Sequence, residues 1–271
     1  MTALDAVRQW PVNATVGVAD RHGIVATVGA AGRPYPWASV TKLLTALATL
    51  VAVEEGSIDL EVPLGPPGAT LRHLLAHASG LPLDGDVPIA AVGRRRIYSN
   101  RGIELAADAV AAHTALAFSD YLDEAVLQPL GLAATHVHGS AAWGAMGPLA
   151  DLLALGVELL APTVVGAATL HDATEVAFPG LSGVLPGFGA QANNDWGLGF
   201  EVRDHKSPHW TGQRNSPRTF GHFGRSGSFL WVDPDAGLAC AGLAEQPFGP
   251  WATKVWPALA DAVLGEFSPR D

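Results

Sequence analysis

The chain has 271 residues, 48% of them hydrophobic and 15% charged, with 31 glycines and 20 prolines spread along its length. This is the composition of a globular protein that buries a large core, as one domain or as two packed lobes, and it excludes a long disordered region. The formal net charge of -10 disfavours nucleic acid or an anionic membrane as a partner, because both demand a dense basic face. The one basic run, Arg94-Arg95-Arg96, is expected to be a solvated loop.

Apolar stretches and cysteine usage bear on the location of the protein. The longest apolar stretch, residues 43–53, is interrupted by Thr45 and Thr49 and is well short of the roughly 20 residues that a membrane-spanning helix needs. The N-terminus carries a charge at Asp5 and has no apolar core followed by small residues, so we expect no secretory signal and a cytoplasmic protein. The single cysteine, Cys240, excludes an internal disulfide and lies in an apolar run that predicts a core strand.

Short β-like runs lie at the two ends of the chain. Residues 15–19 and 24–28 flank the turn residues 20–23 and predict a hairpin. Three more predicted strands cover residues 196–202, 228–232 and 238–244. Because these five strands are split between the ends, the sheet is completed only when the chain returns to it. A tail with helical spacing, residues 251–264, is expected to cover one face of the sheet.

The middle of the chain carries helix-period apolar residues instead. The predicted helices cover residues 41–55, 71–77, 102–113, 121–127, 149–160 and 164–176. Thr70 and Ser119 are the expected N-caps, and Gly56 and Gly131 are the expected stops. The pattern predicts a sheet lobe of residues 1–42 and 195–271, a helical lobe of residues 43–194 inserted into it, and a cleft between the two.

Three short motifs each occur once in the chain, and Ser39-Val40-Thr41-Lys42 is the first. Ser39 stands where a long helix begins and Lys42 faces the same side one turn later, so the two side chains can touch. The helix N-terminus offers free N–H groups to a negative oxygen beside Ser39. A serine hydroxyl needs a base or a nearby cation, and burial can lower the pKa of Lys42 until its amine accepts a proton. The alternative is an ordinary N-cap serine with a solvated lysine.

The second motif, Tyr98-Ser99-Asn100, lies in a loop before the predicted helix 102–113. A phenol near a lysine ammonium ionises more easily, so Tyr98 is a candidate to exchange a proton with Ser39 and then with the leaving group. Asn100 is a candidate to hold Lys42 and a substrate carbonyl. In the alternative, Asn100 caps the following helix and Tyr98 packs half-buried.

The third motif, His222-Phe223-Gly224, precedes the predicted strand 228–232, and Gly224 and Gly227 leave room for a ligand close to the backbone. The N–H of Arg225 is the expected second oxyanion donor, and His222 is expected to hydrogen-bond near the tyrosine or the lysine. In the alternative, a backbone group merely satisfies the histidine. Because the three motifs are unique, ordered and placed on a helix start, a loop and a strand edge, together they predict a serine acyl-transfer site.

Other chemistries find less support in the sequence. The chain has no Gly-x-Ser-x-Gly elbow, which disfavours an α/β-hydrolase, and no glycine-rich nucleotide loop, so no cofactor is expected. His136 and His138, like His205 and His209, have spacings that a metal can use, but no Cys, Asp or Glu completes a convincing set. We therefore expect no metal and a small-molecule substrate.

At these residues the chain resembles the serine β-lactamase-related family, which includes class C β-lactamases, D-Ala-D-Ala carboxypeptidases and β-lactamase-like esterases. The resemblance covers most of the chain, and further similar segments are residues 74–82, 128–132, 196–200 and 221–234. It implies an α+β fold, with an antiparallel five-stranded sheet flanked by N- and C-terminal helices and an inserted helical domain. It also implies that Ser39 is the nucleophile, Lys42 its proton partner and Tyr98 the acid/base, and that the strand beside the third motif binds substrate.

Some residues limit the activities and site residues that the resemblance implies for this chain. His77 and Ser79 are expected to be structural, because their segment looks like a helix C-terminal turn. Lactamase and peptidase members typically have Thr in the middle of the third motif, where its hydroxyl helps to bind a substrate carboxylate, and Phe223 has none. That difference favours an uncharged ester or amide. The short segment between Lys42 and Tyr98 predicts trimmed loops and an open cleft.

The sequence thus predicts a cytoplasmic serine hydrolase, an esterase or amidase that works through an acyl-Ser39 intermediate. A β-lactamase or D-Ala-D-Ala carboxypeptidase is the first alternative, although without an export signal work on cell-wall peptides is disfavoured. A catalytically inactive ligand-binding homologue is the second alternative.

Overall fold

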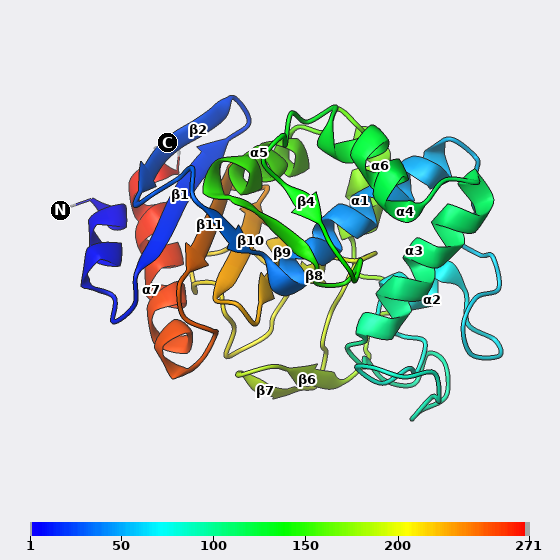
Figure 1. Cartoon of the computed structure of the whole chain (residues 1–271). Coiled ribbons are helices and arrows are strands. Elements are labelled where there is room, and N and C mark those ends of the chain that lie inside the picture. The colour runs from blue at the N-terminus through cyan, green and yellow to red at the C-terminus, as the bar shows by residue number, and fades with distance from the viewer. Residues whose placement is uncertain (1, 269–271) are drawn as a thin grey trace.

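The computed structural model of the chain describes residues 2–268. Its main sheet is six-stranded, and every neighbouring pair of strands is antiparallel (Figure 1). The strand order is β2 (Gly23–Val28), β1 (Ala14–Asp20), β11 (Leu238–Ala244), β10 (Ser228–Asp233), β9 (Phe220–Gly224) and β8 (Glu201–Val202). The N-terminal hairpin therefore pairs with the last strand, as the split of the β-like runs predicted.

Both faces of the sheet are covered, which explains why β10 and β11 are buried along their whole length. Alternate residues of β10 enter two different cores: Phe229 and Trp231 face α7 (Pro250–Phe267), and Leu230 and Val232 face α5 (Leu149–Leu160). The short N-terminal 3-10 helix, Ala3–Gln9, packs beside α7 (Figure 1). Cys240 is buried in β11, as predicted.

The sheet differs from the sequence prediction at one edge. Only the last two residues of the predicted strand 196–202 form β8, because the chain turns before it: Gly199 has φ +87° and the N–H of Gly197 donates to Phe200 O at 2.9 Å. The neighbouring strand β9 was not predicted. Its five residues include two glycines, which carry no strand signal. The sheet consequently has six strands rather than five.

The helices of the middle of the chain lie where the sequence predicted them. They are α1 (Thr41–Glu54), α2 (Leu71–Leu75), α3 (Asn100–Thr114), α4 (Phe118–Leu122), which runs into the π-helical turn Asp123–Leu127, α5, and α6 (Ala167–Thr174). Thr70 caps α2 as expected, but α4 begins one residue before Ser119, so Ser119 is not its N-cap. Helix α1 is buried along nearly its whole length and lies between the sheet and α3 (Figure 1).

Helix α5 belongs to the middle of the sequence and yet lies on the sheet. Its Gly156 has room for no side chain: a Cβ there would lie 3.0 Å from the Cβ of Ala239 in β11, so glycine lets the helix approach closely. Residues 43–194 thus contribute one covering layer of the sheet as well as the helices around α1. The division into lobes at residues 42/43 and 194/195 stays a prediction.

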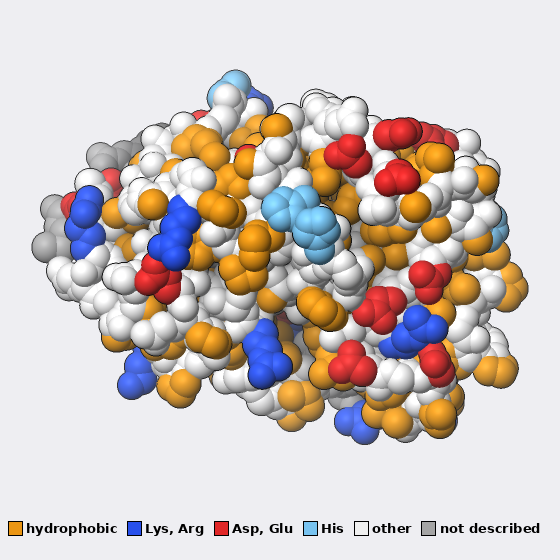
Figure 2. Space-filling view, viewed as in Figure 1, with side chains coloured by type: hydrophobic (Ala, Val, Ile, Leu, Met, Phe, Trp, Pro, Cys, Tyr) orange, Lys and Arg blue, Asp and Glu red, His pale blue; other side chains and the backbone are white. Residues whose placement is uncertain are grey.

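Other short strands form smaller sheets. Strands β3 (Pro34–Pro36), β5 (Ala145–Pro148) and β4 (His136–Val137) form a small sheet, and β6 (Gly183–Leu185) pairs with β7 (Gly189–Gln191) in a hairpin. Figure 2 shows acidic side chains gathered over the helical side of the molecule, in keeping with the net charge of -10. None of the helices within residues 2–268 combines the length and the apolar character that crossing a membrane requires.

Candidate active site

Ser39 lies in a 3-10 turn, Ala38–Val40, directly before α1. Two hydroxyl groups of the β9–β10 hairpin bind the residues just before this turn: Ser226 Oγ donates to Pro36 O at 2.7 Å and Ser228 Oγ donates to Trp37 O at 2.6 Å. Gly224 makes this approach possible, because a Cβ at its position would lie 2.5 Å from Trp37 O. The β9–β10 hairpin therefore fixes the start of α1 against the edge of the sheet.

Lys42 is fully buried one turn after Ser39, and its amine has three oxygen partners. Nζ lies 2.8 Å from Asn100 Oδ1, 2.9 Å from Ala142 O and 3.4 Å from Ser39 Oγ. Burial lowers the pKa of Lys42 to about 7, against the opposing charges of Glu104 and Asp84. The two carbonyl-type oxygens can only accept, so a neutral amine donates both of its hydrogens to them and turns its lone pair to the serine.

Tyr98 covers the lysine from the loop before α3. Lys42 Nζ lies 4.7 Å from the centre of the Tyr98 ring, and the phenol oxygen lies 3.4 Å from His222 Nε2. Burial raises the pKa of Tyr98, and a hydrogen bond with Ser39 only partly opposes that effect. Desolvation therefore dominates, and the net direction is opposite to the easier ionisation that the sequence predicted for this phenol.

His222 of β9 has its ring between Tyr98 and the strand backbone. Its Nδ1 lies 2.7 Å from Phe223 O, and a carbonyl only accepts, so Nδ1 carries the hydrogen. Burial, with a smaller contribution from the charge of Lys42, lowers the pKa of His222 to about 3. The ring is thus neutral at pH 7, and its Nε2 lone pair accepts from the Tyr98 hydroxyl. The histidine is satisfied by a backbone group and also contacts the tyrosine.

Asn100 is the first residue of α3 but does not cap it. Ser99 is the cap, since its Oγ accepts from the N–H of Gly102 at 3.0 Å. The Asn100 side chain is free to turn inward, where Oδ1 accepts from Lys42 and Nδ2 donates to Asp84 Oδ1 at 3.2 Å. The sequence reasoning missed Asp84, which lies in a loop with no spacing pattern that points to the lysine.

An open cleft of about 1060 Å³ gives access to Ser39, as the short segment before Tyr98 predicted. Residues from both sides line it, among them Ser39, Tyr98, Asn100, Trp143, Val184 and Arg225. The structure therefore brings Ser39, Lys42, Tyr98, Asn100 and His222 together, with Arg225 at the cleft. The side chain of Phe223 packs in an aromatic cluster with Trp210, Phe248 and Trp256 and lines a smaller cavity that also includes Ser39 and Tyr98.

The structure also shows the surroundings of Arg96 and His77. Arg96 is not a solvated residue: only 2% of it is exposed, and its guanidinium donates to the carbonyls of Ala76, Ala177 and Asn194 at 2.5 to 3.0 Å. A sequence run of arginines gives no sign of such main-chain partners. His77 has the structural place expected for it, since its buried Nδ1 accepts from the N–H of Ser99 at 3.2 Å.

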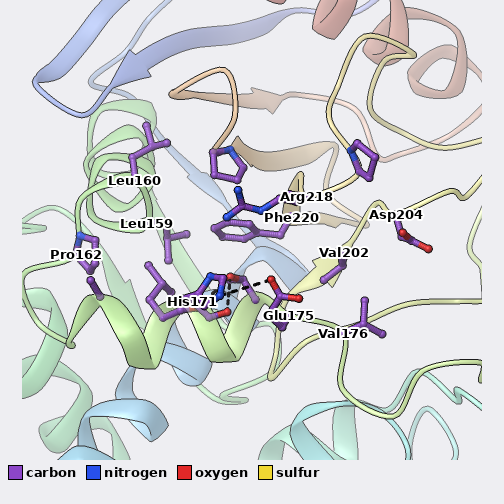
Figure 3. A pocket seen from close by; sticks show the side chains of 15 residues that line it. Leu159, Leu160, Pro162, His171, Glu175, Val176, Val202, Asp204, Arg218 and Phe220 are labelled. Carbon is purple, nitrogen blue, oxygen red and sulfur yellow. Dashed lines mark hydrogen bonds and ion pairs between the residues drawn. The ribbon is translucent and has the colours of Figure 1, made fainter.

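A separate cavity of about 280 Å³ lies between α5, α6 and the end of the sheet, and it includes no residue of the three motifs (Figure 3). Figure 3 shows His171 of α6 and Glu175, the C-cap of that helix, directed at each other, and their ring nitrogen and carboxylate oxygen lie 3.9 Å apart. Arg218 at its rim pairs with Asp235 at 2.9 Å. His171, Glu175 and Arg218 of this cavity thus have charged partners within the protein.

The histidines that were weighed as metal ligands have other surroundings. Within residues 2–268 no three or more His, Cys, Asp or Glu side chains form a group able to hold a metal. The His136 and His138 rings lie 4.8 Å apart, with no third ligand. His209 is buried against Glu201, whose carboxylate also accepts from Lys206 and, at 2.8 Å, from the indole of Trp210.

The chain is similar in fold to several proteins of known structure. The chain is 51% identical to a β-lactamase from Mycobacterium bovis, with a TM-score of 0.97, over 99% of this chain and 100% of that one. Two more distant structures share the fold: simvastatin synthase from Aspergillus terreus (19% identity, TM-score 0.76, 98% and 93% covered) and a D-stereospecific amidohydrolase from a Streptomyces species (20%, 0.73, 97% and 97%).

No curated protein matches the sequence. The family model described as Beta-lactamase, in contrast, matches residues 1–264, which span the sheet, the helices and all three motifs. The chain therefore belongs to the β-lactamase family.

Proposed function

We propose that this protein is a serine hydrolase that cleaves a small uncharged ester or amide through an acyl-enzyme on Ser39. The observation that carries the proposal is the buried Lys42 amine, 3.4 Å from Ser39 Oγ, with its two other partners restricted to accepting hydrogens. Its pKa of about 7 leaves a large neutral fraction at neutral pH. Such an amine can take the serine proton as Oγ attacks.

Every proton transfer of the proposed reaction takes place between side chains of the site and the substrate or water. The bond from Ser39 Oγ to the substrate carbonyl carbon forms while Lys42 takes the serine proton. The backbone N–H groups of Ser39 and Arg225 are the proposed donors to the oxyanion. The leaving group then takes the proton of the Tyr98 phenol, and the lysine ammonium restores it. In the second step, water attacks the acyl carbon and gives a proton to Lys42; the bond from the acyl carbon to Ser39 Oγ then breaks, and Lys42 returns that proton to Oγ.

Tyr98 suits the donor role for a physical reason. Its raised pKa keeps the phenol protonated in the free enzyme, and His222 Nε2, at 3.4 Å, orients the hydroxyl without taking the proton. The ring lies over the lysine amine, so the ammonium formed in the first step favours the phenolate formed in the second. Proton transfer is thereby ordered, with the lysine first and the tyrosine second.

The preference for an uncharged substrate rests on Phe223. Its aromatic side chain packs against Phe248 and Trp256 and offers no hydroxyl to a substrate carboxylate. A β-lactamase is the second candidate, favoured by the 51% identity to the M. bovis protein that carries this name. Hydrolysis of a chromogenic cephalosporin distinguishes the two candidates, because the cephalosporin carries a carboxylate, whereas the substrate of the proposed hydrolase is uncharged.

The test of the proposal is turnover of p-nitrophenyl acetate and p-nitrophenyl butanoate by the native chain, Ser39→Ala and Tyr98→Phe. We expect turnover in the native chain and its loss, by at least about a hundredfold, in both variants. Turnover that persists in Ser39→Ala contradicts the proposal. A native chain that binds esters without turning them over is the inactive ligand-binding homologue. The cytoplasmic location stays a prediction.

A further inference from the structure

A second, smaller cavity of about 220 Å³ opens beside the nucleophile. It shares Ser39, Tyr98, Pro186 and Arg225 with the open cleft of about 1060 Å³. Ser39 therefore stands at the junction of two spaces that differ in size. An ester bound at the serine has two substituents, the acyl group and the alcohol, and the junction gives each of them a space of its own.

The walls of the inner cavity are mainly apolar. Its apolar lining consists of Leu185, Pro186, Trp196, Phe223 and Phe248. Arg225, exposed at the junction with the open cleft, and Glu201 are the charged residues of the lining; Glu201 accepts hydrogen bonds from Lys206, His209 and Trp210, so its charge is matched inside the protein. A charged substituent placed here finds no free partner on this carboxylate and loses its water. The cavity selects for an apolar group.

The β6–β7 hairpin separates the two spaces. Successive residues of β6 point to opposite sides of the strand. Leu185, 1% exposed, lines the inner cavity, whereas Val184, 56% exposed, lines the open cleft. The turn of the hairpin closes onto the far wall: a Cβ at Gly187 would lie 2.7 Å from the ring of Phe248. The hairpin thus lies between the inner cavity, on its Leu185 side, and the open cleft, on its Val184 side.

We propose that the inner cavity binds the acyl group of the substrate and that this group is a branched or cyclic hydrocarbon of about the size of a benzoyl group. This inference rests on the proposed hydrolase function. The acyl group stays on Ser39 through both steps, whereas the alcohol must leave and water must enter, which requires the open side. The size follows from the volume, because an apolar cavity of about 150 Å³ holds benzene.

The experiment compares kcat/KM for p-nitrophenyl esters of acetate, butanoate, cyclohexanecarboxylate and decanoate. Each buried methylene is worth about fourfold in kcat/KM, so the rate constant rises from acetate to cyclohexanecarboxylate and falls for decanoate, which exceeds the cavity. Phe248→Ala enlarges the cavity and moves the optimum to decanoate. Leu185→Trp fills it and favours acetate over cyclohexanecarboxylate by at least about tenfold relative to the native chain.

Val184→Trp is the matched control, because it places the same side chain one residue away in the open cleft. It leaves the ranking of acyl groups unchanged and alters the ranking of alcohols in a series of cyclohexanecarboxylate esters. Circular dichroism confirms that each variant is folded.

The outcomes separate this inference from the proposed function. Turnover that depends on Ser39 but is equal for all acyl groups, or that shifts as much in Val184→Trp as in Leu185→Trp, overturns the acyl cavity and leaves the hydrolase intact. If no ester is turned over, labelling of Ser39 by methyl and cyclohexyl p-nitrophenyl phosphonates is compared by mass spectrometry. Faster labelling by the cyclohexyl reagent supports the cavity, and equal labelling overturns it. Absence of both turnover and labelling overturns the proposed function and the inference together.

Discussion

The Lys42 amine donates to the Asn100 amide oxygen over 2.8 Å. The orientation of that amide is set from outside the site, because Asn100 Nδ2 donates to Asp84 Oδ1 at 3.2 Å. The oxygen therefore faces the lysine whether the amine is charged or neutral. One of the two hydrogens of the neutral amine always has an acceptor, and this leaves its lone pair for Ser39.

The rate of acylation should depend on the neutral form of Lys42. Since burial lowers the pKa of this lysine to about 7, kcat/KM is expected to rise with pH through about 7 and to level off above it. The nearby carboxylate of Glu104 raises that pKa. Glu104→Gln, which keeps an acceptor for Ser140 Oγ, moves the rise to lower pH by about half a unit. The measurement is a pH profile for an ester substrate.

Glu124→Gln is the matched control for this profile, because Glu124 is exposed on the π-helical turn after α4 and does not act on the pKa of Lys42. Its profile should match that of the native chain. A kcat/KM that falls instead of rising as the pH passes through about 7 would show that the protonated lysine is the active form.

Removal of the Tyr98 hydroxyl should reduce kcat by about 10² to 10⁴ and leave the fold intact, since the ring and its packing against His77 and Trp196 remain. His222→Leu removes the acceptor that orients the phenol but leaves the phenol in place, so its effect on kcat should be smaller. Tyr121→Phe is the control, because its hydroxyl donates to Glu55 at 2.8 Å, far from the cleft. Steady-state kinetics of the three variants measures these effects, and equal losses in Tyr98→Phe and Tyr121→Phe would refute the assignment.

Phe223→Thr should shift the preference toward substrates with a carboxylate. The new hydroxyl is expected to raise kcat/KM for a chromogenic cephalosporin by at least about tenfold relative to a p-nitrophenyl ester, since a charged hydrogen bond is worth roughly 1.5–3 kcal/mol. Loss of the ring from the cluster of Phe248 and Trp256 should lower the free energy of unfolding by about 2–4 kcal/mol. Phe223→Ala is the control: it shares the loss of stability without the gain for the cephalosporin.

Lys42 should lower the stability of the protein at low pH. Its folded-state pKa of about 7 lies below the ordinary lysine value of 10.5, so protonation favours the unfolded chain, and the penalty is largest below pH 7 and is lost as pH rises toward 10.5. Between pH 6 and pH 9 the free energy of unfolding of the native chain should rise by about 2–3 kcal/mol more than that of Lys42→Met. Urea unfolding of both chains at the two pH values measures the difference. An equal rise would mean that the folded lysine titrates normally.

The sequence predicted helices and the residues that gather around Ser39 correctly where the signal lies within a short segment. Helix α5 has the bounds that its apolar period predicted, and Thr70 caps α2. The three motifs also predicted which residues gather around Ser39, because each motif lies at the end of an element whose place in the fold the family resemblance implied. The capping of α3 by Ser99 rather than Asn100 needed the structure, since both residue types are good caps.

The remaining features depend on contacts between residues far apart in the sequence. Glu201, Lys206 and His209 come from a strand end and a loop, and single charges in such segments usually face water. The β6–β7 hairpin consists of two three-residue strands, too short for an alternating pattern, so neither the hairpin nor the cavity under Leu185 could be predicted. Arg96 was misread for the same reason, because its partners are carbonyl groups that any sequence offers.

The central claim is that Ser39 becomes acylated, and intact-protein mass spectrometry during turnover of a slowly hydrolysed ester tests it most directly. The account predicts a mass increase equal to the acyl group minus one hydrogen, located in the peptide that contains Ser39 and absent from Ser39→Ala. In Lys42→Met the adduct should form at least about a hundredfold more slowly. An adduct on another residue, or turnover by Ser39→Ala at the native rate, would contradict the account.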